Sequence, residues 1–299
     1  MQLIMENWRQ YSKQINEDRD FNLILEKIEN SNDENVVNET IEQWLFEQER
    51  IMSEIDVTAL AQKGRDLISQ KVNDFLITFY FKATNVIQSI LKAGLKAISP
   101  AIKVLKFIND KVGGFLRKHP VISKIAIILL LALVMLCASA VFSAAAANPK
   151  PEDIALTNKI INVLQGILAD SMTDVSGISG AQDLLSPELT PEVKTAYANA
   201  INKLETLKGQ DLNAKELIKL SGDSGDSVES ALNLFRNVVK NPPTEDFTAD
   251  DIQTAISKWE RCGEAIEKAY YSFKKFATAT GSSETERLGF SGPGFPTKK

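Results

Sequence analysis

The sequence predicts an all-α protein in which a single transmembrane helix lies between two helical arms, the C-terminal arm being a small helical bundle. Residues 125–147 carry no charge, and at about 1.5 Å per helical residue they are long enough to cross a hydrocarbon core of roughly 30 Å. Before this stretch apolar residues recur at intervals of mostly three, four or seven, as they do along one face of a helix, and after it capping residues mark the starts of further helices.

The transmembrane interpretation of residues 121–147 has three alternatives. A core helix of a larger fold is one, although such helices usually keep a polar edge. A displaced signal peptide is another, because small residues from Ser143 to Ala147 resemble a cleavage site. The third is a helix covered inside a protein assembly, where no bilayer is present. We favour an uncleaved anchor, since the stretch is longer than a signal's apolar region and lies far from residue 1.

Basic residues gather immediately before the apolar stretch, against only Asp110: they are Lys92, Lys96, Lys103, Lys106, Lys111, Arg117, Lys118 and Lys124. Cytoplasmic flanks of membrane helices carry such an excess of Lys and Arg. The asymmetry therefore predicts a membrane protein with its N-terminus in the cytoplasm and its C-terminal arm outside.

Residues 85–120 form a basic amphipathic segment in which lysines separate apolar residues at helical spacing. We expect Pro100 to break or kink this segment. Helices of this composition lie at a membrane surface and present their cations to anionic headgroups, so the eight basic residues above are candidate membrane contacts. An ordinary amphipathic helix, packed on a neighbour with solvated lysines, is the equally weighted alternative.

The remaining boundaries follow from turn-forming and helix-capping residues in the sequence. Residues 1–84 form the N-terminal helical arm, with a helix near residues 6–29, a polar turn, and a long apolar-periodic segment over residues 36–81. The C-terminal bundle covers residues 148–281, with helices expected to start after Pro151, Thr190, Asp211 or Asn213, Asp226 and Thr248. Residues 282–299 are polar and rich in Gly and Pro, so we expect a disordered tail.

Composition excludes several classes of function. The net charge of −5 argues against a nucleic-acid-binding protein. Cys137, Cys262 and His119 are too few for a disulfide framework or a Cys/His metal site. The string GDSGD at residues 222–226 resembles the sequence around a protease's nucleophilic serine, but a helix-capping turn is the favoured interpretation of it. We therefore predict no catalytic, cofactor-binding or metal-binding residue, and rank a serine hydrolase using Ser224 lowest.

Aromatic side chains near the C-terminus are candidates for binding other protein subunits, including further copies of the chain through helix pairing of the coiled-coil kind. They are Trp259, Tyr270, Tyr271, Phe273, Phe290 and Phe295. Core packing is the simpler explanation for those that lie in a helix. Small residues of the apolar stretch, Ala138, Ser139, Ala140, Ser143 and Ala144, would also permit close helix approach.

The opening residues MQLIMENWRQY resemble the N-termini of proteins encoded by tailed phages of marine bacteria, in which a Glu-Asn-Trp-Arg string recurs soon after the start. Ile4-Met5-Glu6 is similar to the cleavage sites of the prohead proteases of such phages. The resemblance implies a phage-encoded, virion-associated protein, and it implies no catalytic residue.

Together these features predict a non-enzymatic single-pass membrane protein, a virion structural or internal protein that acts through membrane contact and protein binding. A membrane-permeabilising lysis or ejection factor, built from the amphipathic segment and the span, is the alternative function.

Overall fold

The computed structural model describes residues 19–31, 33–61, 65–92, 98–112, 120–147, 150–176, 191–205, 214–240 and 249–280, and the account below concerns these residues. All of them are helical except Ser31, Asp33 and Lys150. The prediction of an all-α fold is therefore confirmed. The predicted tail at residues 282–299 lies outside the described residues, as does the phage-like string at residues 1–11.

The N-terminal part of the chain begins with a helix over residues 19–30, followed by α2 (Glu34–Ala61) and α3 (Arg65–Lys92). The predicted polar turn precedes α2, where the Asp33 carboxylate accepts a hydrogen bond from the backbone N–H of Asn35 and caps the helix. The single long segment expected over residues 36–81 is two helices instead.

The basic segment folds as α4 (Ile98–Phe107), which runs into a five-residue π-helical turn, η2 (Ile108–Val112). Pro100 stands in the first turn of α4, where its missing N–H costs no intrahelical hydrogen bond. Helix α3 ends at Lys92 and α4 begins at Ile98, and residues 93–97 lie outside the described residues. The predicted boundary between residues 84 and 85 falls within α3.

The apolar stretch is α6 (Pro120–Ala147), and α7 (Pro151–Ser176), α8 (Pro191–Glu205), α9 (Ala214–Lys240) and α10 (Ala249–Thr280) follow it. The starts of α7, α8 and α10 lie where the sequence predicted them. The prediction of a turn and a new helix at residues 222–226 is wrong, since α9 runs through this string without a break.

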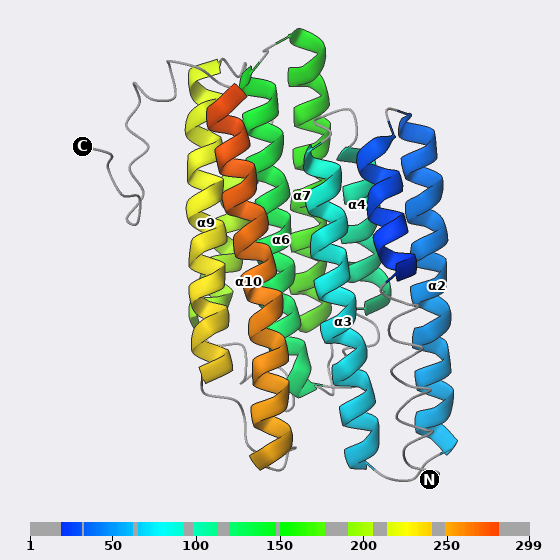
Figure 1. Ribbon diagram of the computed structural model, residues 1–299. Coiled ribbons are helices and arrows are strands. Elements are labelled where there is room, and N and C mark those ends of the chain that lie inside the picture. The colour runs from blue at the N-terminus through cyan, green and yellow to red at the C-terminus, as the bar shows by residue number, and fades with distance from the viewer. Residues whose placement is uncertain are drawn as a thin grey trace, which may run out of the picture.

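The helices run roughly along one common axis, with α6 in the middle of the bundle (Figure 1). Helix α6 packs most extensively against α9, and also against α7, α10, α3, α4 and α8. Helices α3 and α10, from the two predicted arms, pack against each other as well as against α6. In this fold the arms are therefore not held apart by the apolar helix; both contribute to one bundle around it.

Candidate functional site

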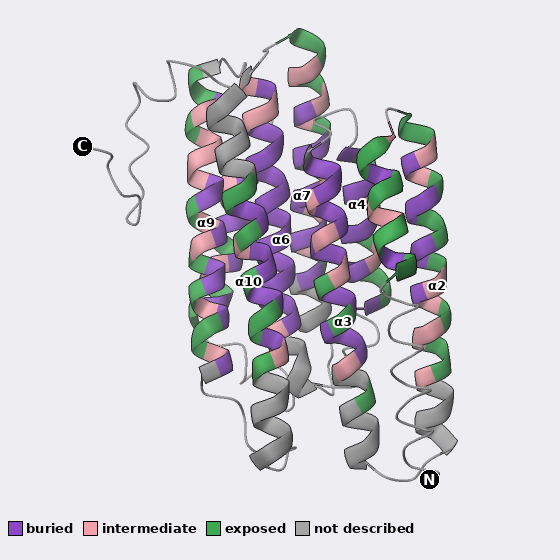
Figure 2. Cartoon of the chain, in the orientation of Figure 1, coloured by how far each residue is buried: buried purple, intermediate pink, exposed green. Residues whose placement is uncertain are grey.

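The most unusual element of the fold is the apolar part of α6, Ile125–Ala146, the one stretch among the described residues that is long and apolar enough to cross a membrane. Its most apolar window is entirely buried within the bundle. Figure 2 shows the middle of α6 in the colour of buried residues, while the outer helices alternate buried and exposed positions. A helix that is apolar all round has to be covered by protein or by lipid, and here protein covers it.

The surrounding helices are amphipathic and hold α6 mainly by apolar packing. Helix α9, for example, turns Leu217, Val228 and Phe235 inward, while Asp226 and Arg236 are exposed. On α3, Phe79 and Val86 are fully buried, whereas Thr78 is exposed. The sheath, meaning α3, α4, α7, α8, α9 and α10, thus offers α6 an apolar surface and offers water a polar one.

Helices α6 and α9 meet along small residues. The hydroxyl of Ser139 donates to the backbone oxygen of Ser221 at 2.9 Å, and the Ser221 hydroxyl lies 2.5 Å from that of Ser143. Ser224 and Gly225, one turn further along α9, are also buried. The string that resembled a protease serine or a turn is therefore a helix-packing surface, because residues without bulk let two backbones approach closely.

Two tyrosines fasten the N-terminal part of α6 to the sheath. The hydroxyl of Tyr80 on α3 donates to the backbone oxygen of Ala126 at 3.0 Å, and that of Tyr197 on α8 donates to the next carbonyl, Ile127, at 2.7 Å. Burial raises the pKa of both phenols well above their ordinary value, with a smaller contribution from a neighbouring group in each case. Both side chains therefore act as neutral donors.

Helices α9 and α10 interlock through two glycines. A Cβ added to Gly225 would lie 2.5 Å from the Tyr270 hydroxyl oxygen, and one added to Gly263 would lie 2.5 Å from Cε1 of Phe235. Each helix thus receives an aromatic ring of the other over a glycine. The arrangement explains why two glycines persist in helix interiors, where they otherwise weaken a helix.

The candidate partner-binding aromatics divide between core and surface. Trp259 and Tyr270 are buried, Trp259 against Tyr80 and Tyr270 over Gly225, so core packing accounts for both. Tyr271 is exposed over 39% of its surface. The Phe273 side chain, Phe290 and Phe295 lie outside the described residues.

Of the candidate membrane-contact residues, three have described side chains. Lys106 is exposed on α4. Lys103 pairs with Glu42 at 2.5 Å, and Lys111 of η2 pairs with Glu49 at 2.7 Å, both carboxylates belonging to α2. The hydrogen bond that Lys111 donates to Glu49 raises the pKa of Lys111, as does the attraction of that carboxylate. All four side chains are substantially exposed, so solvent screens both pairs and each stabilises the helix contact only weakly. The side chains of Lys92, Lys96, Arg117, Lys118 and Lys124 lie outside the described residues.

The described residues provide few side chains suited to catalysis or metal binding. They contain no group of three or more His, Cys, Asp or Glu side chains suited to a metal ion. Ser224 is buried in the middle of α9, facing other helices, and His119 lies outside the described residues. The two cysteines, Cys137 on α6 and Cys262 on α10, are both free and buried.

Comparisons with known proteins add no further assignment. No protein-family model, curated protein or solved structure matches the chain. The covered apolar helix, its amphipathic sheath and the α2 ion pairs are therefore the features from which function has to be argued.

Proposed function

We propose that this protein is a non-enzymatic membrane-acting protein that keeps α6 covered in a closed bundle and inserts it into a bilayer when the sheath opens. The observation that carries the proposal is the apolar character of α6 on every side. The core of a helical bundle needs only an apolar surface, whereas a bilayer also needs a length of about 20 uncharged residues, which this helix has.

The two forms would use the same residues differently. In the closed bundle the apolar faces of the sheath helices cover α6. In the membrane-bound form, lipid would cover α6, and the sheath helices would lie in the interface with their apolar faces in the acyl region and their charges in water. Ser139 and Ser143 fit both environments, because a serine hydroxyl in a helix can also bond a carbonyl of its own preceding turn.

This proposal combines the two functions expected from the sequence. A protein packaged in a virion meets no bilayer until it reaches a host, so an apolar helix has to travel covered. The resemblance of the N-terminal residues to phage-encoded proteins supports a role of this kind at assembly or genome delivery. A permanently anchored single-pass protein is the competing form of the same function.

The proposal is tested by mixing the purified full-length chain with vesicles that contain anionic phospholipid and encapsulated dye. We expect the protein to stay on sedimented vesicles through a wash at about 1 M salt, where attraction between exposed charges is screened within roughly 3 Å, and to release dye. Neutral vesicles are the control for surface charge. Protein that leaves the vesicles in the wash and releases no dye would show that α6 is simply a core helix.

A permanent anchor gives a different result from the same preparation. An anchored protein would sediment with cell membranes on expression and would need detergent for purification. A closed bundle would instead be recovered from the soluble fraction and would bind only the vesicles that are added afterwards.

A further inference from the structure

Two ion pairs join α2 to the basic segment at one edge of the bundle. In each pair a carboxylate of α2 meets a lysine of α4 or η2. Glu42 and Glu49 lie seven residues apart on α2, which is about two helical turns, so both face the same way. Their partners Lys103 and Lys111 lie eight residues apart, one residue too many for the same match along a regular α-helix.

The π-helical turn η2 resolves this mismatch. A π-turn accommodates one additional residue in a helix, so eight residues that include η2 advance about as far around the axis as seven in α2. The turn is held in place from the other side, because the Ser171 hydroxyl of α7 lies 2.6 Å from Oδ1 of the buried Asn109. The π-turn thus presents Lys111 to Glu49 while Lys103 meets Glu42.

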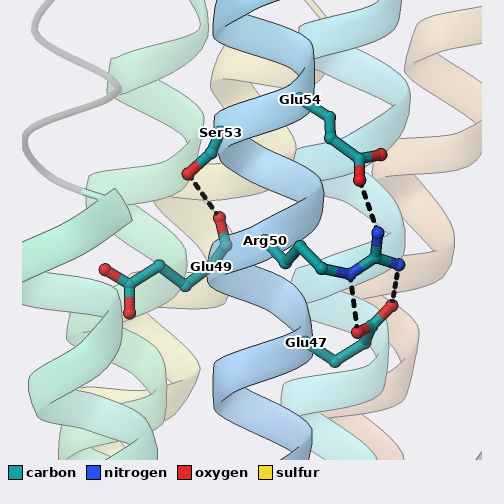
Figure 3. A network of polar contacts seen from close by, with 5 residues as sticks. All are labelled: Glu47, Glu49, Arg50, Ser53 and Glu54. Atoms are coloured by element: carbon teal, nitrogen blue, oxygen red, sulfur yellow. Dashed lines mark hydrogen bonds and ion pairs between the residues drawn. The ribbon is translucent and has the colours of Figure 1, made fainter.

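Helix α2 occupies an outer position. Its main helix contacts are with α3 and α4, and α4 in turn packs against α6 (Figure 1). On the side of α2 opposite the Glu49 side chain, Arg50 bonds Glu47 and Glu54 of the same helix (Figure 3). Loss of α2 would therefore uncover the lysines of α4 and η2 while leaving the rest of the sheath on α6.

From this arrangement we propose that α2 is an acidic cover over a lipid-binding surface, and that anionic phospholipid headgroups displace it by competing for Lys103 and Lys111. The surface consists of Lys103, Lys106 and Lys111, of which Lys106 and Lys111 are already exposed to water. Its partner is an anionic bilayer, because the three cations stand beside apolar residues that an interface can accept, such as the half-buried Ile102 and Phe107. The inference rests on the proposed function, in which it supplies the first contact.

Displacement of α2 also uncovers its apolar face, on which Ile41 and Trp44 are buried, so several lysines have to act together and the bilayer has to accept that face. The ion pairs to Glu42 and Glu49 are exposed, and dissolved salt screens the attraction between their charges. Each pair therefore holds α2 only weakly. Lipid offers a new partner for each released lysine and for Lys106 at the same time. Binding should therefore depend steeply on the anionic fraction of the bilayer.

The test compares two double variants of the full-length chain that remove equal charge from α2. Glu42→Gln with Glu49→Gln removes the partners of the lysines; Glu47→Gln with Glu54→Gln removes two partners of Arg50 and leaves Glu42 and Glu49 in place. Sedimentation with anionic vesicles at low salt should show roughly 5- to 30-fold tighter binding for the first pair than for the second. The comparison is stringent, because the control variant also releases a guanidinium group toward lipid.

Adding Lys103→Gln and Lys111→Gln to the first variant should abolish its gain, and all variants should bind neutral vesicles equally. Circular dichroism checks that each exposed substitution leaves the helices intact. Equal binding by the two double variants would overturn the acidic cover, even if the wild-type chain still resisted the salt wash. If the wash at about 1 M salt instead removed every variant from the vesicles, the proposed insertion of α6 would be overturned, whatever the affinities of the variants for the vesicles at low salt.

Discussion

At the scale of single residues, the bundle depends on polar groups that are neutral and satisfied in its interior. Tyr80 and Tyr197 donate to consecutive carbonyls of α6, and burial keeps both phenols protonated far above the pH at which an exposed tyrosine ionises. Neither contact was expected from the sequence, because a tyrosine at an apolar helical position shows nothing about which backbone oxygen its hydroxyl will reach.

These phenols predict a loss of stability in alkali. In the unfolded chain a tyrosine releases its proton near pH 10, whereas the folded bundle retains it, so the unfolded state binds fewer protons above that pH. The free energy of unfolding should thus fall above about pH 10, by up to about 1.4 kcal/mol per pH unit for each buried tyrosine, and be unaffected by them below it.

The measurement is the urea midpoint between pH 8 and pH 11. Tyr197→Phe should lower stability by about 1 kcal/mol at pH 8, through loss of its hydrogen bond, and should make the alkaline decline shallower. Tyr271→Phe, at a largely exposed site, should change the decline less. A decline in Tyr197→Phe as steep as in the wild-type chain would contradict this account of the buried phenol.

At the scale of helices, the contact between α9 and α10 depends on two glycines. Gly263→Ala should destabilise the fold by about 1–3 kcal/mol, because the new methyl group would lie within 3 Å of two carbon atoms of the Phe235 ring. Gly166→Ala on α7 is the matched control: no heavy atom lies within 4 Å of its added Cβ, so a gain of about 0.4–1 kcal/mol is expected. Urea unfolding measures both, and equal effects would mean that Gly263 is not a packing residue.

Helix prediction succeeded where local signals and packing agree. Helices α7, α8 and α10 begin where Pro or a capping residue precedes an apolar-periodic run, and the apolar residues of α6 were identified as one helix. It failed in α9, because Ser, Gly and Asp favour turns in isolation. There Ser221 bonds α6 and Gly225 makes room for Tyr270 of α10, and local sequence does not show such long-range contacts.

The lysines of the basic segment illustrate the same limit. Their spacing predicted an amphipathic cationic surface, and either a membrane or an acidic helix could pack against such a surface. The structure pairs two of them with α2. The register depends on η2, and a single inserted residue in a π-turn leaves no distinctive pattern in the sequence.

At the scale of the whole molecule, the proposed insertion exchanges the packing of the closed bundle for burial of α6 in lipid. The Ile125–Ala146 stretch contains eleven Ile, Leu, Val or Phe residues, each worth roughly 0.3–0.6 kcal/mol on transfer into a bilayer, or about 3–6 kcal/mol together. A folded domain is stable by about 5–15 kcal/mol. Insertion of α6 alone therefore offsets only part of the lost packing, and adsorption of the sheath helices has to supply the rest.

The sequence predicted two arms on opposite sides of a membrane because an apolar helix flanked by cations satisfies the rules for an anchor. The same helix satisfies the requirements of a bundle core, and only the packing of α3 and α10 on both each other and α6 distinguishes the arrangements. Amphipathic helices on both sides of the apolar stretch were the available signal, since each needs an apolar surface to cover.

The two native cysteines provide the most direct test of the central claim, that α6 leaves a protein sheath for lipid. In the closed bundle Cys262 is buried, its thiol donates to the backbone oxygen of Ile77 at 3.3 Å, and burial raises its pKa to about 12, so it should resist alkylation. Cys137, within α6, is buried as well.

The measurement is alkylation of the full-length chain by a membrane-impermeant thiol reagent, with and without anionic vesicles, each cysteine being followed separately by mass spectrometry. Without vesicles both should be protected, and in denaturant both should react. With vesicles, our account predicts that Cys262 reacts as α10 separates from α3, while Cys137 stays protected in the bilayer. Protection of both would mean that the bundle does not open, and reaction of both would mean that it unfolds without inserting α6; either result would contradict the account.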